Sequence, residues 1–409
     1  HAPGEYYATQ FGYTSNGLLA AVTNASEHWT RFAYNAQGLL TNAQPQVGPA
    51  VSYGYSGLGY VTNITAPWLT TNRATAFTVD DLGRVLAILY PDGGQEDMAY
   101  DALGNLTNHV DRAGRTTRFD YLPASKLSAV VRLRADGTAV TNRYEFDNQF
   151  NALTVRDALD REVEAYALDL QDRVTNVVNL EDQSLAITYG LGDKVRRVKR
   201  FDGSYVTNDY NGDGLLSLVG YPGTTNRFAY FRNGWLRSVS NESSAMAMDY
   251  NGAGWLTNLS VTASGLPGYT NRYGYHPAGS LSNAVTVAGT NTYLVDAAER
   301  VTNITAQLAG LATPLAFKLS YRADNGMLSQ VLCTNTGFRV NYLSDDILDR
   351  LTAIEYKKDA SAMVASVNYE RDVDTGLITQ KSTTINGQTT TEQYAYDDLD
   401  RLVGEKRID

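Results

Sequence analysis

A tyrosine-centred repeat runs through the whole chain and limits the folds open to it more than any other feature. The clearest copies are Tyr100-Asp-Ala-Leu-Gly104-Asn-Leu-Thr-Asn and Tyr250-Asn-Gly-Ala-Gly254-Trp-Leu-Thr-Asn. Copies recur from Tyr13 to Tyr396 at a mean spacing of about 22 residues, which gives about 18 units. No linker, composition shift or charge run interrupts the series. We therefore predict a single continuous array over residues 1–409, with repeats from about residue 6 to 403.

Each unit carries two turn signals, and this predicts two strands per unit. The first signal directly follows the tyrosine, and the second lies about ten residues later, as where Gly104 is followed by Ala113-Gly114 and Gly214 by Pro222-Gly223. The segments left between the turns are about six to eight residues long, which is strand length and too short for a typical helix. The repeat unit is therefore expected to be a β-hairpin.

The segment before each tyrosine alternates between apolar and polar residues. In Arg227-Phe228-Ala229-Tyr230, the two rings are two residues apart and share one face of a strand, whereas Arg227 points to the other face. In the segment after the turn, apolar residues are three apart, as in Val301 to Ile304, with Thr-Asn between them. Because this spacing breaks strict alternation, we predict a β-bulge near Thr-Asn in each unit.

The residues that we expect to build the repeat are the aromatic residues in and at the end of the segment that leads to each tyrosine, and the glycines of the turn that directly follows the tyrosine. They are Tyr34, Gly38, Tyr55, Gly59, Tyr100, Gly104, Tyr121, Tyr210, Gly214, Phe228, Tyr230, Gly234, Tyr250, Gly254, Tyr273, Tyr275, Gly279 and Tyr396.

A sheet of this size cannot stay flat. About 36 strands at about 4.8 Å spacing form a ribbon roughly 170 Å long. Strongly twisted open sheets rarely exceed about ten strands without curling, and a ribbon rolled once would be roughly 55 Å across, too wide for side chains to fill. The sequence thus predicts an all-β fold, a curled antiparallel sheet forming a spiral or open barrel or shell around a cavity. Contacts between neighbouring hairpins and aromatic ladders would stabilise it.

The run Tyr100-Asp-Ala-Leu-Gly-Asn-Leu-Thr107 resembles the YD repeat of the RHS (rearrangement hotspot) family, and Tyr396-Asp-Asp-Leu-Asp-Arg-Leu402 is a second close match. The resemblance covers nearly all of the chain. It implies a β-sheet spiral that walls off a hollow cage. In bacterial RHS and toxin-complex proteins such a cage holds a toxic C-terminal domain, and in teneurins a similar barrel serves cell-surface recognition. By resemblance alone, the expected location is extracellular or at the cell surface.

The chain also departs from the family pattern. Encapsulating members end their repeats in a core region with an Asp-Pro-containing signature, at which an aspartate-dependent self-cleavage often frees the toxin. Here Asp374-Thr-Gly-Leu377 is only a faint echo of that signature. We therefore expect no separate plug, core-protease or toxin domain within these residues. The expected partners are an enclosed cargo or flanking domains of a longer parent protein, with self-association through unpaired edge strands as a further possibility.

Composition excludes several classes of function. The net charge is −10 and there is no basic run, which argues against a nucleic-acid partner. A single cysteine, Cys333, excludes an internal disulfide framework and a cysteine-based zinc site. No stretch approaches the roughly 20 apolar residues that a membrane-spanning helix needs, so no membrane span is expected.

The sequence offers one motif with metal-ligand spacing. Asp209-Tyr-Asn211-Gly-Asp213-Gly214 resembles the opening of an EF-hand calcium loop, but the position of its closing glutamate is occupied by Gly220. The same residues are the expected repeat turn, so we favour a hairpin turn and predict no metal and no cofactor.

Catalytic arrangements are equally poorly supported. His28, His109 and His276 fall at unrelated phases of the repeat, outside any Ser- or Cys-centred motif. Cys333 is interpreted as a buried small side chain. The acidic pairs Asp345-Asp346 and Asp397-Asp398 stand where the repeat itself places aspartate. We predict no catalytic residue.

These observations favour a non-enzymatic structural shell that encloses or displays a cargo or partner domain. An alternative is an extracellular adhesion or glycan-binding module that uses the aromatic-rich sheet. A self-processing or enzymatic fragment is the third hypothesis.

Overall fold

The structure is a computed structural model and describes residues 8–68, 71–134, 136–344 and 346–408. In these residues the chain forms 36 β-strands and two short 3-10 segments, η1 (Pro123–Ser125) and η2 (Leu191–Asp193). The predicted all-β array of antiparallel hairpins is confirmed. None of the helical segments in the described ranges is long and apolar enough to cross a membrane.

The chain divides into two compact units that are interleaved in sequence. Unit 1 comprises residues up to 98, residues 110–114 and residues from 273 onward, and unit 2 comprises residues 99–109 and 115–272. The single continuous array over residues 1–409 remains a prediction.

Unit 1 contains two runs of strands. The N-terminal run consists of β1 (Gln10–Tyr13), β2 (Leu19–Thr23), β3 (Trp29–Tyr34), β4 (Leu40–Pro45), β5 (Val51–Tyr55), β6 (Val61–Trp68), β7 (Thr71–Val79), β8 (Val85–Leu89) and most of β9 (Gln95–Tyr100). The C-terminal run consists of β26 (Leu281–Thr286), β27 (Gly289–Val295), β28 (Val301–Leu308), β29 (Leu315–Tyr321), β30 (Leu328–Cys333), β31 (Arg339–Leu343), β32 (Ala353–Lys357), β33 (Met363–Arg371), β34 (Ile378–Ile385), β35 (Gln388–Tyr396) and β36 (Leu402–Ile408).

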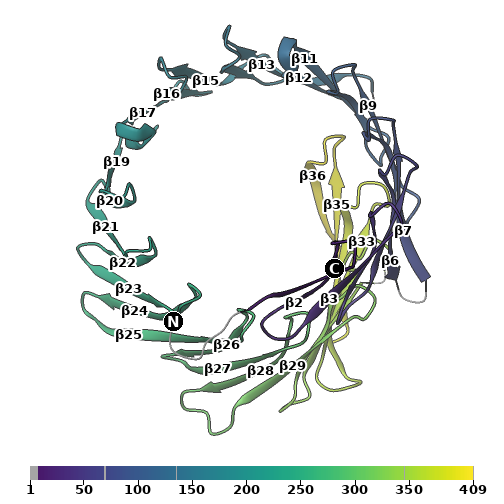
Figure 1. The fold of residues 1–409 in the computed structure, drawn as a ribbon, viewed down its shortest axis with the longest axis vertical. Coiled ribbons are helices and arrows are strands. Elements are labelled where there is room, and N and C mark those ends of the chain that lie inside the picture. The colour runs from purple at the N-terminus through teal and green to yellow at the C-terminus, as the bar shows by residue number, and fades with distance from the viewer. Residues whose placement is uncertain (1–7, 69–70, 135, 345, 409) are drawn as a thin grey trace. The chain divides into compact units, whose positions relative to one another are not determined.

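Unit 2 contains one run of strands, which follow one another along a single curved layer (Figure 1). They are most of β10 (Leu106–Val110), then β11 (Thr116–Leu122), β12 (Lys126–Leu133), β13 (Ala139–Phe146), β14 (Ala152–Arg156), β15 (Glu162–Leu168), β16 (Val174–Asn179), β17 (Ser184–Tyr189), β18 (Val195–Lys199), β19 (Tyr205–Tyr210), β20 (Leu216–Tyr221), β21 (Thr224–Tyr230), β22 (Leu236–Ser240), β23 (Ser244–Tyr250), β24 (Leu256–Ala263) and most of β25 (Leu266–Tyr275).

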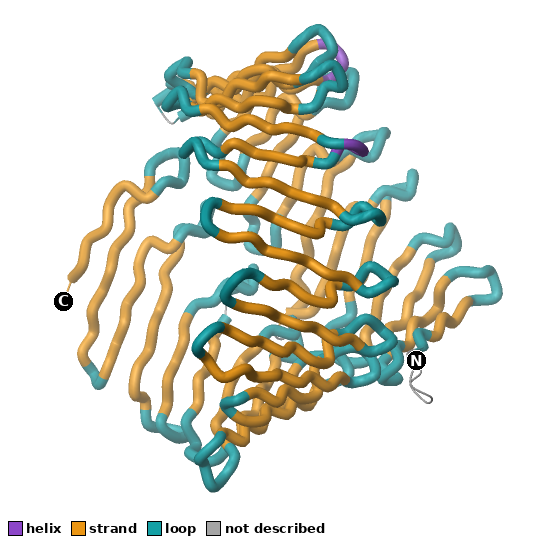
Figure 2. Tube along the Cα trace, turned by 90° about the vertical axis from the view of Figure 1, so that its left-hand side faces the viewer, coloured by secondary structure: helices purple, strands orange, loops and turns teal. Residues whose placement is uncertain are grey.

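Consecutive strands within each run pair antiparallel, as β21 does with β22, and the strands of successive hairpins lie side by side in one layer (Figure 2). The chain therefore turns alternately at two edges of the sheet. We call the turns that lead from an odd-numbered to an even-numbered strand the tyrosine turns, because most follow the repeat tyrosine. The turns from an even-numbered to an odd-numbered strand are the second turns.

The predicted bulge after the tyrosine turn is confirmed by the strand register in most hairpins, but not in β31–β32, where Tyr342 pairs with Ile354 and Leu343 with Ala353 without a shift. In the β3–β4 hairpin, Ala33 pairs with Asn42 and Tyr34 with Leu40, so Thr41 has no residue opposite it. The Thr41 hydroxyl donates to the carbonyl of Ala33 at 3.2 Å. Threonine hydroxyls make the same bond at Thr107, Thr175, Thr257 and Thr302. The Thr-Asn signature thus marks a bulge whose threonine satisfies a strand carbonyl.

The aspartate after the tyrosine holds the tyrosine turn closed. In the turn after Tyr100, one carboxylate oxygen of Asp101 accepts the backbone N–H groups of Leu103 and Asn105, each at 2.9 Å. The other oxygen accepts the side-chain amide of Asn105 at 2.8 Å. Gly104 sits in this turn at φ 90°, a conformation that favours glycine. These contacts explain why an acid or amide, a glycine and a long polar residue recur together.

We expect Asp101→Ala to lower the urea midpoint of unfolding, because two turn N–H groups lose their acceptor. Asp101→Asn should lower the midpoint less than Asp101→Ala, since Asn35 accepts the equivalent N–H groups of Gln37 and Leu39 in its own turn and only the contribution of the charge is lost. The bond from Asn105 holds the pKa of Asp101 below its ordinary value of 3.8. The charge contribution is therefore present above pH 3.8 and lost as pH falls through the lowered pKa. Equal midpoints for the two variants at pH 7 would contradict this role.

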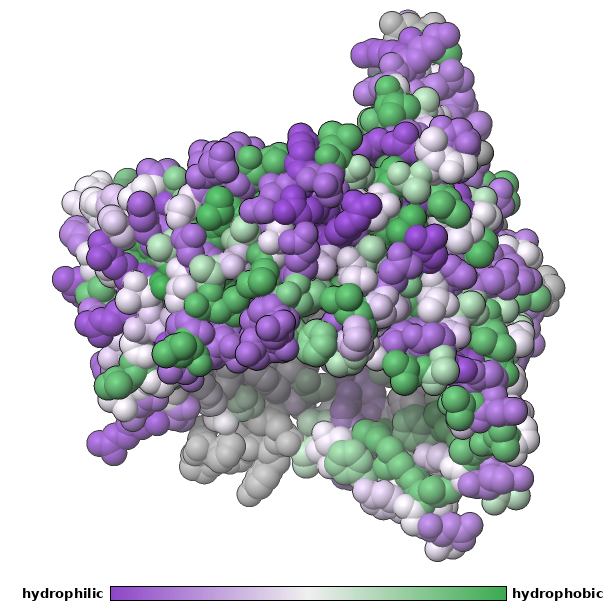
Figure 3. Space-filling view, turned by 90° about the horizontal axis from the view of Figure 1, so that it is seen from above, coloured by the Kyte–Doolittle hydropathy of each residue, from purple (hydrophilic) through white to green (hydrophobic). Residues whose placement is uncertain are grey.

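The sheet has very little compact core. The solvent-accessible surface is 24010 Å², whereas a compact protein of 44.7 kDa is expected to expose about 15,600 Å². Among the described residues, the buried apolar ones are Ala129, Val131, Val219, Ala284, Cys333 and Ala353. On the face drawn in Figure 3, apolar and polar residues are interspersed. Contacts between neighbouring strands therefore take the place of a central core.

Candidate functional site

Eight of the repeat tyrosines join their hairpin to the one before it. Tyr230, the last residue of β21, donates its hydroxyl to the carbonyl of Leu216, the first residue of β20, at 2.8 Å. The same bond recurs at 2.6–3.0 Å from Tyr34, Tyr55, Tyr121, Tyr189, Tyr210, Tyr321 and Tyr396. It explains why the position favours tyrosine over phenylalanine: the ring packs in the ladder while the hydroxyl satisfies a carbonyl next to the preceding bulge.

A side chain from the preceding tyrosine turn covers many of these rings. The guanidinium of Arg173 lies 4.4 Å from the ring centroid of Tyr189, and that of Arg300 lies 4.4 Å from Tyr321. In the β21–β22 turn the covering residue is Trp235, whose ring is 5.4 Å from that of Tyr250. A Cβ added at Gly254 would lie 2.8 Å from the Trp235 ring, so glycine leaves room for this contact as well as adopting φ 85°.

The structure places the predicted repeat residues at equivalent positions. The tyrosines other than Tyr121 and Tyr273 end their strands, and Tyr121 is the last residue but one of β11. The predicted glycines lie in tyrosine turns at positive φ, namely Gly38, Gly59, Gly104, Gly214, Gly234, Gly254 and Gly279. Along β21, Arg227 and Ala229 are exposed whereas Phe228 and Tyr230 are half-buried, which agrees with rings on one face and Arg227 on the other.

A polar cluster in unit 1 joins its two runs. Glu299, in the β27–β28 tyrosine turn, accepts hydrogen bonds from Asn24 at 3.2 Å, His28 at 2.8 Å and Ser280 at 2.6 Å. Asn24 and His28 lie in the β2–β3 second turn, 271 residues from Glu299 in the case of His28. Burial alone would raise the pKa of Glu299, but the bonds from Ser280, His28 and Asn24 outweigh it and hold that pKa below its ordinary value.

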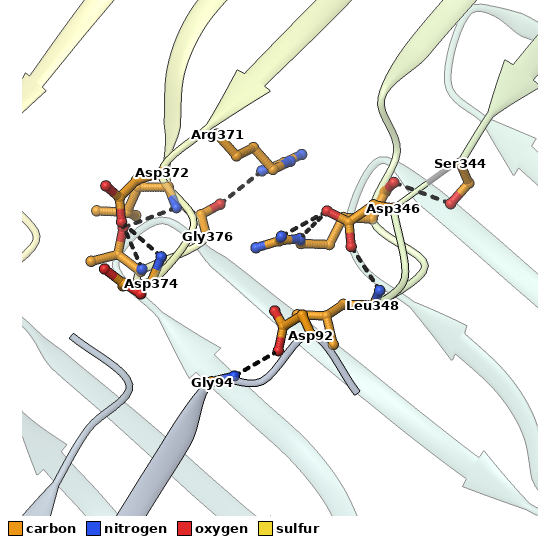
Figure 4. A network of polar contacts seen from close by, with 12 residues as sticks. Asp92, Gly94, Ser344, Asp346, Leu348, Arg371, Asp372, Asp374 and Gly376 are labelled. Carbon is orange, nitrogen blue, oxygen red and sulfur yellow. Dashed lines mark hydrogen bonds and ion pairs between the residues drawn. The ribbon is translucent and has the colours of Figure 1, made fainter. Parts of the chain in front are cut away.

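A second contact between the runs has the same plan. Asp349, in the β31–β32 tyrosine turn, forms an ion pair with Arg73 of β7 and accepts the side-chain amide of Asn325 at 2.7 Å. Figure 4 shows the neighbouring turn of Asp92 and Gly94 beside Asp346 and Leu348. Asp346 accepts the N–H of Leu348 at 2.7 Å, and Asp92 accepts that of Gly94 at 3.2 Å. In both contacts a tyrosine turn of the C-terminal run meets the second-turn edge of the N-terminal run.

The sequence-based candidates for chemistry do not come together. His28 bonds Glu299, and His276 contacts the Tyr293 carbonyl at 3.0 Å through Nε2. Cys333 is buried on β30, and hydrogen bonding from Thr336 lowers the pKa of its thiol. His109 lies on β10.

In the calcium-like motif and the acidic pairs, Asn211, Asp346 and Asp397 bond groups of their own turns. Asp209 on β19 instead forms an ion pair with Arg196 at 3.2 Å. Asn211 of the calcium-like motif accepts the N–H groups of Asp213 and Leu215 at 3.1 and 2.9 Å. Asp397 is bonded by Arg401, which lowers the pKa of Asp397 to about 2. Asp345 lies outside the described residues. Within the described ranges, no three His, Cys, Asp or Glu side chains are grouped as a metal site.

Sequence reasoning missed Glu299 and Asp349. Both occupy the turn position that other repeats give to glycine, at φ 58° and 63°. A side chain at such a position costs about 1–2 kcal/mol relative to glycine. An acid in the glycine position does not by itself reveal a contact that compensates for this cost, because Asp160, Asp172 and Asp400 occupy equivalent positions at φ 61°, 59° and 63°.

Comparison with known proteins agrees with the repeat pattern. The family model described as RHS Repeat matches residues 79–116 and 100–139. No curated protein sequence matches the chain.

Solved toxin-complex structures have the same fold. The crystal structure of TcdB2-TccC3-Cdc42 has a TM-score of 0.76 at 14% identity, over 95% of this chain and 23% of that chain. The structure of TcdB2-TccC3 without its hypervariable C-terminal region has the same TM-score and identity, over 99% of this chain and 23% of that one. A Photorhabdus luminescens Tc holotoxin pore matches with a TM-score of 0.75 at 13% identity, over 97% and 23%.

This chain thus spans about a quarter of the length of the structures that it matches. The repeat pattern and the shared fold support a structural role. Residues 79–139 thus match the RHS repeat family model, and the chain shares its fold with the TcdB2-TccC3 structures.

Proposed function

We propose that this chain is a non-enzymatic wall of YD repeats that encloses or displays a cargo or partner domain, in a protein secreted or exposed at the cell surface. The observation that carries the proposal is the likeness in fold to TcdB2-TccC3 over nearly all of the chain. Two further features support it: the surface is far larger than that of a compact protein, and the repeat tyrosines and turn acids are engaged in contacts between and within hairpins.

Small-angle X-ray scattering and limited proteolysis test the wall directly. A compact protein of this length is expected to have a radius of gyration of about 22 Å. A wall around a cavity should give a clearly larger radius of gyration, with the maximum of the pair-distance distribution shifted to longer distances, as for a hollow particle. A cargo domain or partner protein produced together with this chain should resist protease until the wall is unfolded. A compact scattering profile, or a cargo cleaved as fast as an unfolded chain, would overturn the proposal.

A glycan array separates the wall from the adhesion alternative. We expect the 409-residue chain to bind no soluble sugar, because repeat rings such as those of Tyr189, Tyr321 and Tyr250 are covered by neighbouring side chains. Reproducible hits that disappear in Trp235→Ala would favour glycan binding instead.

A further inference from the structure

Unit 1 contains one well-formed example of how an edge of this sheet binds another edge. Leu348 and Asp349, at the tip of a tyrosine turn, lie against the second-turn edge of the N-terminal run. Together with Ile64, Tyr90 and Pro91 they line a pocket of about 270 Å³. The ion pair between Arg73 and Asp349 fixes the polar side of this contact. A second-turn edge can therefore bind a tyrosine turn that has an apolar residue at its tip.

The tyrosine turns of the N-terminal run carry the same apolar tip, but there the tip is exposed. Leu58 in the β5–β6 turn is 65% exposed and Leu82 in the β7–β8 turn is 72% exposed. Leu82 stands two residues after Asp80 and Leu348 two residues after Asp346, and each aspartate accepts the backbone N–H of its leucine, so the two leucines occupy equivalent turn positions. Exposed leucines are shared by turns of unit 2, as at Leu103 and Leu170, so exposure alone does not mark this edge. What distinguishes it is that the equivalent leucine in unit 1, Leu348, is seated against a second-turn edge.

The second turns of the C-terminal run form a matching apolar edge. Leu311 in the β28–β29 turn is 45% exposed, and Ile385 beside the β34–β35 turn is 55% exposed. Phe338 and Met363, beside the two second turns between them, are also exposed. Unit 1 thus presents an apolar tyrosine-turn edge on its N-terminal run and an apolar second-turn edge on its C-terminal run. These are the two kinds of edge that meet at Leu348.

We propose that these two edges bind each other between copies of the chain, so that the tyrosine turns at Leu58 and Leu82 of one copy seat on the second-turn edge at Leu311 to Ile385 of a second copy. This contact between two copies would have the same plan as the contact inside unit 1, in which a tyrosine turn packs against a second-turn edge. Because it joins two different surfaces, it is heterologous and adds copies head to tail without closing into a two-fold dimer. The inference concerns association of the chain with itself and does not depend on its enclosing a cargo.

Sedimentation velocity of the 409-residue chain over a range of concentrations tests the proposal. The wild type should form dimers and longer chains as concentration rises. Leu58→Asp combined with Leu82→Asp, and separately Leu311→Asp combined with Ile385→Asp, should each weaken self-association at least about tenfold. Because all four residues are exposed, both double variants should keep the far-ultraviolet circular dichroism of the wild type.

Mixing the two double variants gives the sharpest outcome. Each retains the one edge that the other lacks, so an equimolar mixture should form 1:1 dimers that grow no further. Leu294→Asp, an exposed leucine on β27 away from both edges, should associate like the wild type. A wild type that stays monomeric, double variants that still associate, or a mixture that forms no dimer would each overturn the proposal.

Discussion

Replacing both Phe228 and Tyr230 with alanine is expected to lower the free energy of unfolding by about 3–5 kcal/mol. Both side chains are half-buried on one face of β21, and Tyr230 also bonds the Leu216 carbonyl of the preceding strand. The substitution removes two rings from the ladder and leaves a carbonyl without its donor. Urea or thermal unfolding followed by circular dichroism measures the loss. It is a large effect for a sheet that has almost no central core.

Arg227 on the opposite face provides the control. Its side chain is exposed, so Arg227→Ala should change the free energy of unfolding by no more than about 0.5 kcal/mol. Tyr230→Phe isolates the hydroxyl and should cost about 1 kcal/mol, since the ring remains. If Arg227→Ala were as destabilising as the double variant, the assignment of faces would be wrong.

The sequence predicts the local structure because the residues that determine it lie within the same repeat. The Thr-Asn bulge, the Asx-type turn of Asp101 and the alternation at Arg227-Phe228-Ala229-Tyr230 all involve residues close together in sequence, and each recurs many times. Repetition lets a weak signal in one copy be recognised from the others. The antiparallel hairpin array was therefore predictable in nearly full detail.

The contacts between the two runs of unit 1 were not predictable in the same way. His28 and Glu299 are 271 residues apart, and Arg73 and Asp349 are 276 apart. Each pair occurs once, so no periodicity reveals it, and the polar residues involved are of types that turns use everywhere. Which edge meets which depends on the curvature accumulated over many strands, and small differences in twist per strand add up beyond what a sequence pattern can specify.

Glu299→Gly should loosen the contact between the runs, although it restores the glycine typical of the repeat. Glycine removes the strain of a side chain at φ 58°, a gain of about 1–2 kcal/mol. It also removes three hydrogen bonds, from Asn24, His28 and Ser280, at about 1 kcal/mol or more each. Hydrogen exchange should therefore become several-fold faster at the amides of the β2–β3 turn, with a net loss of stability of about 1–2 kcal/mol.

Asp172→Gly is the matched control, because Asp172 occupies the same turn position at φ 59° in unit 2. There, relief of strain should dominate, so this variant should be neutral or more stable by up to about 1 kcal/mol. The effect of Glu299→Gly should also depend on pH. Since the pKa of Glu299 is below its ordinary value of 4.5, its contribution is complete above pH 4.5 and disappears as pH falls through the lowered pKa. Equal responses of the two glycine variants at pH 7 would show that Glu299 does not hold the runs together.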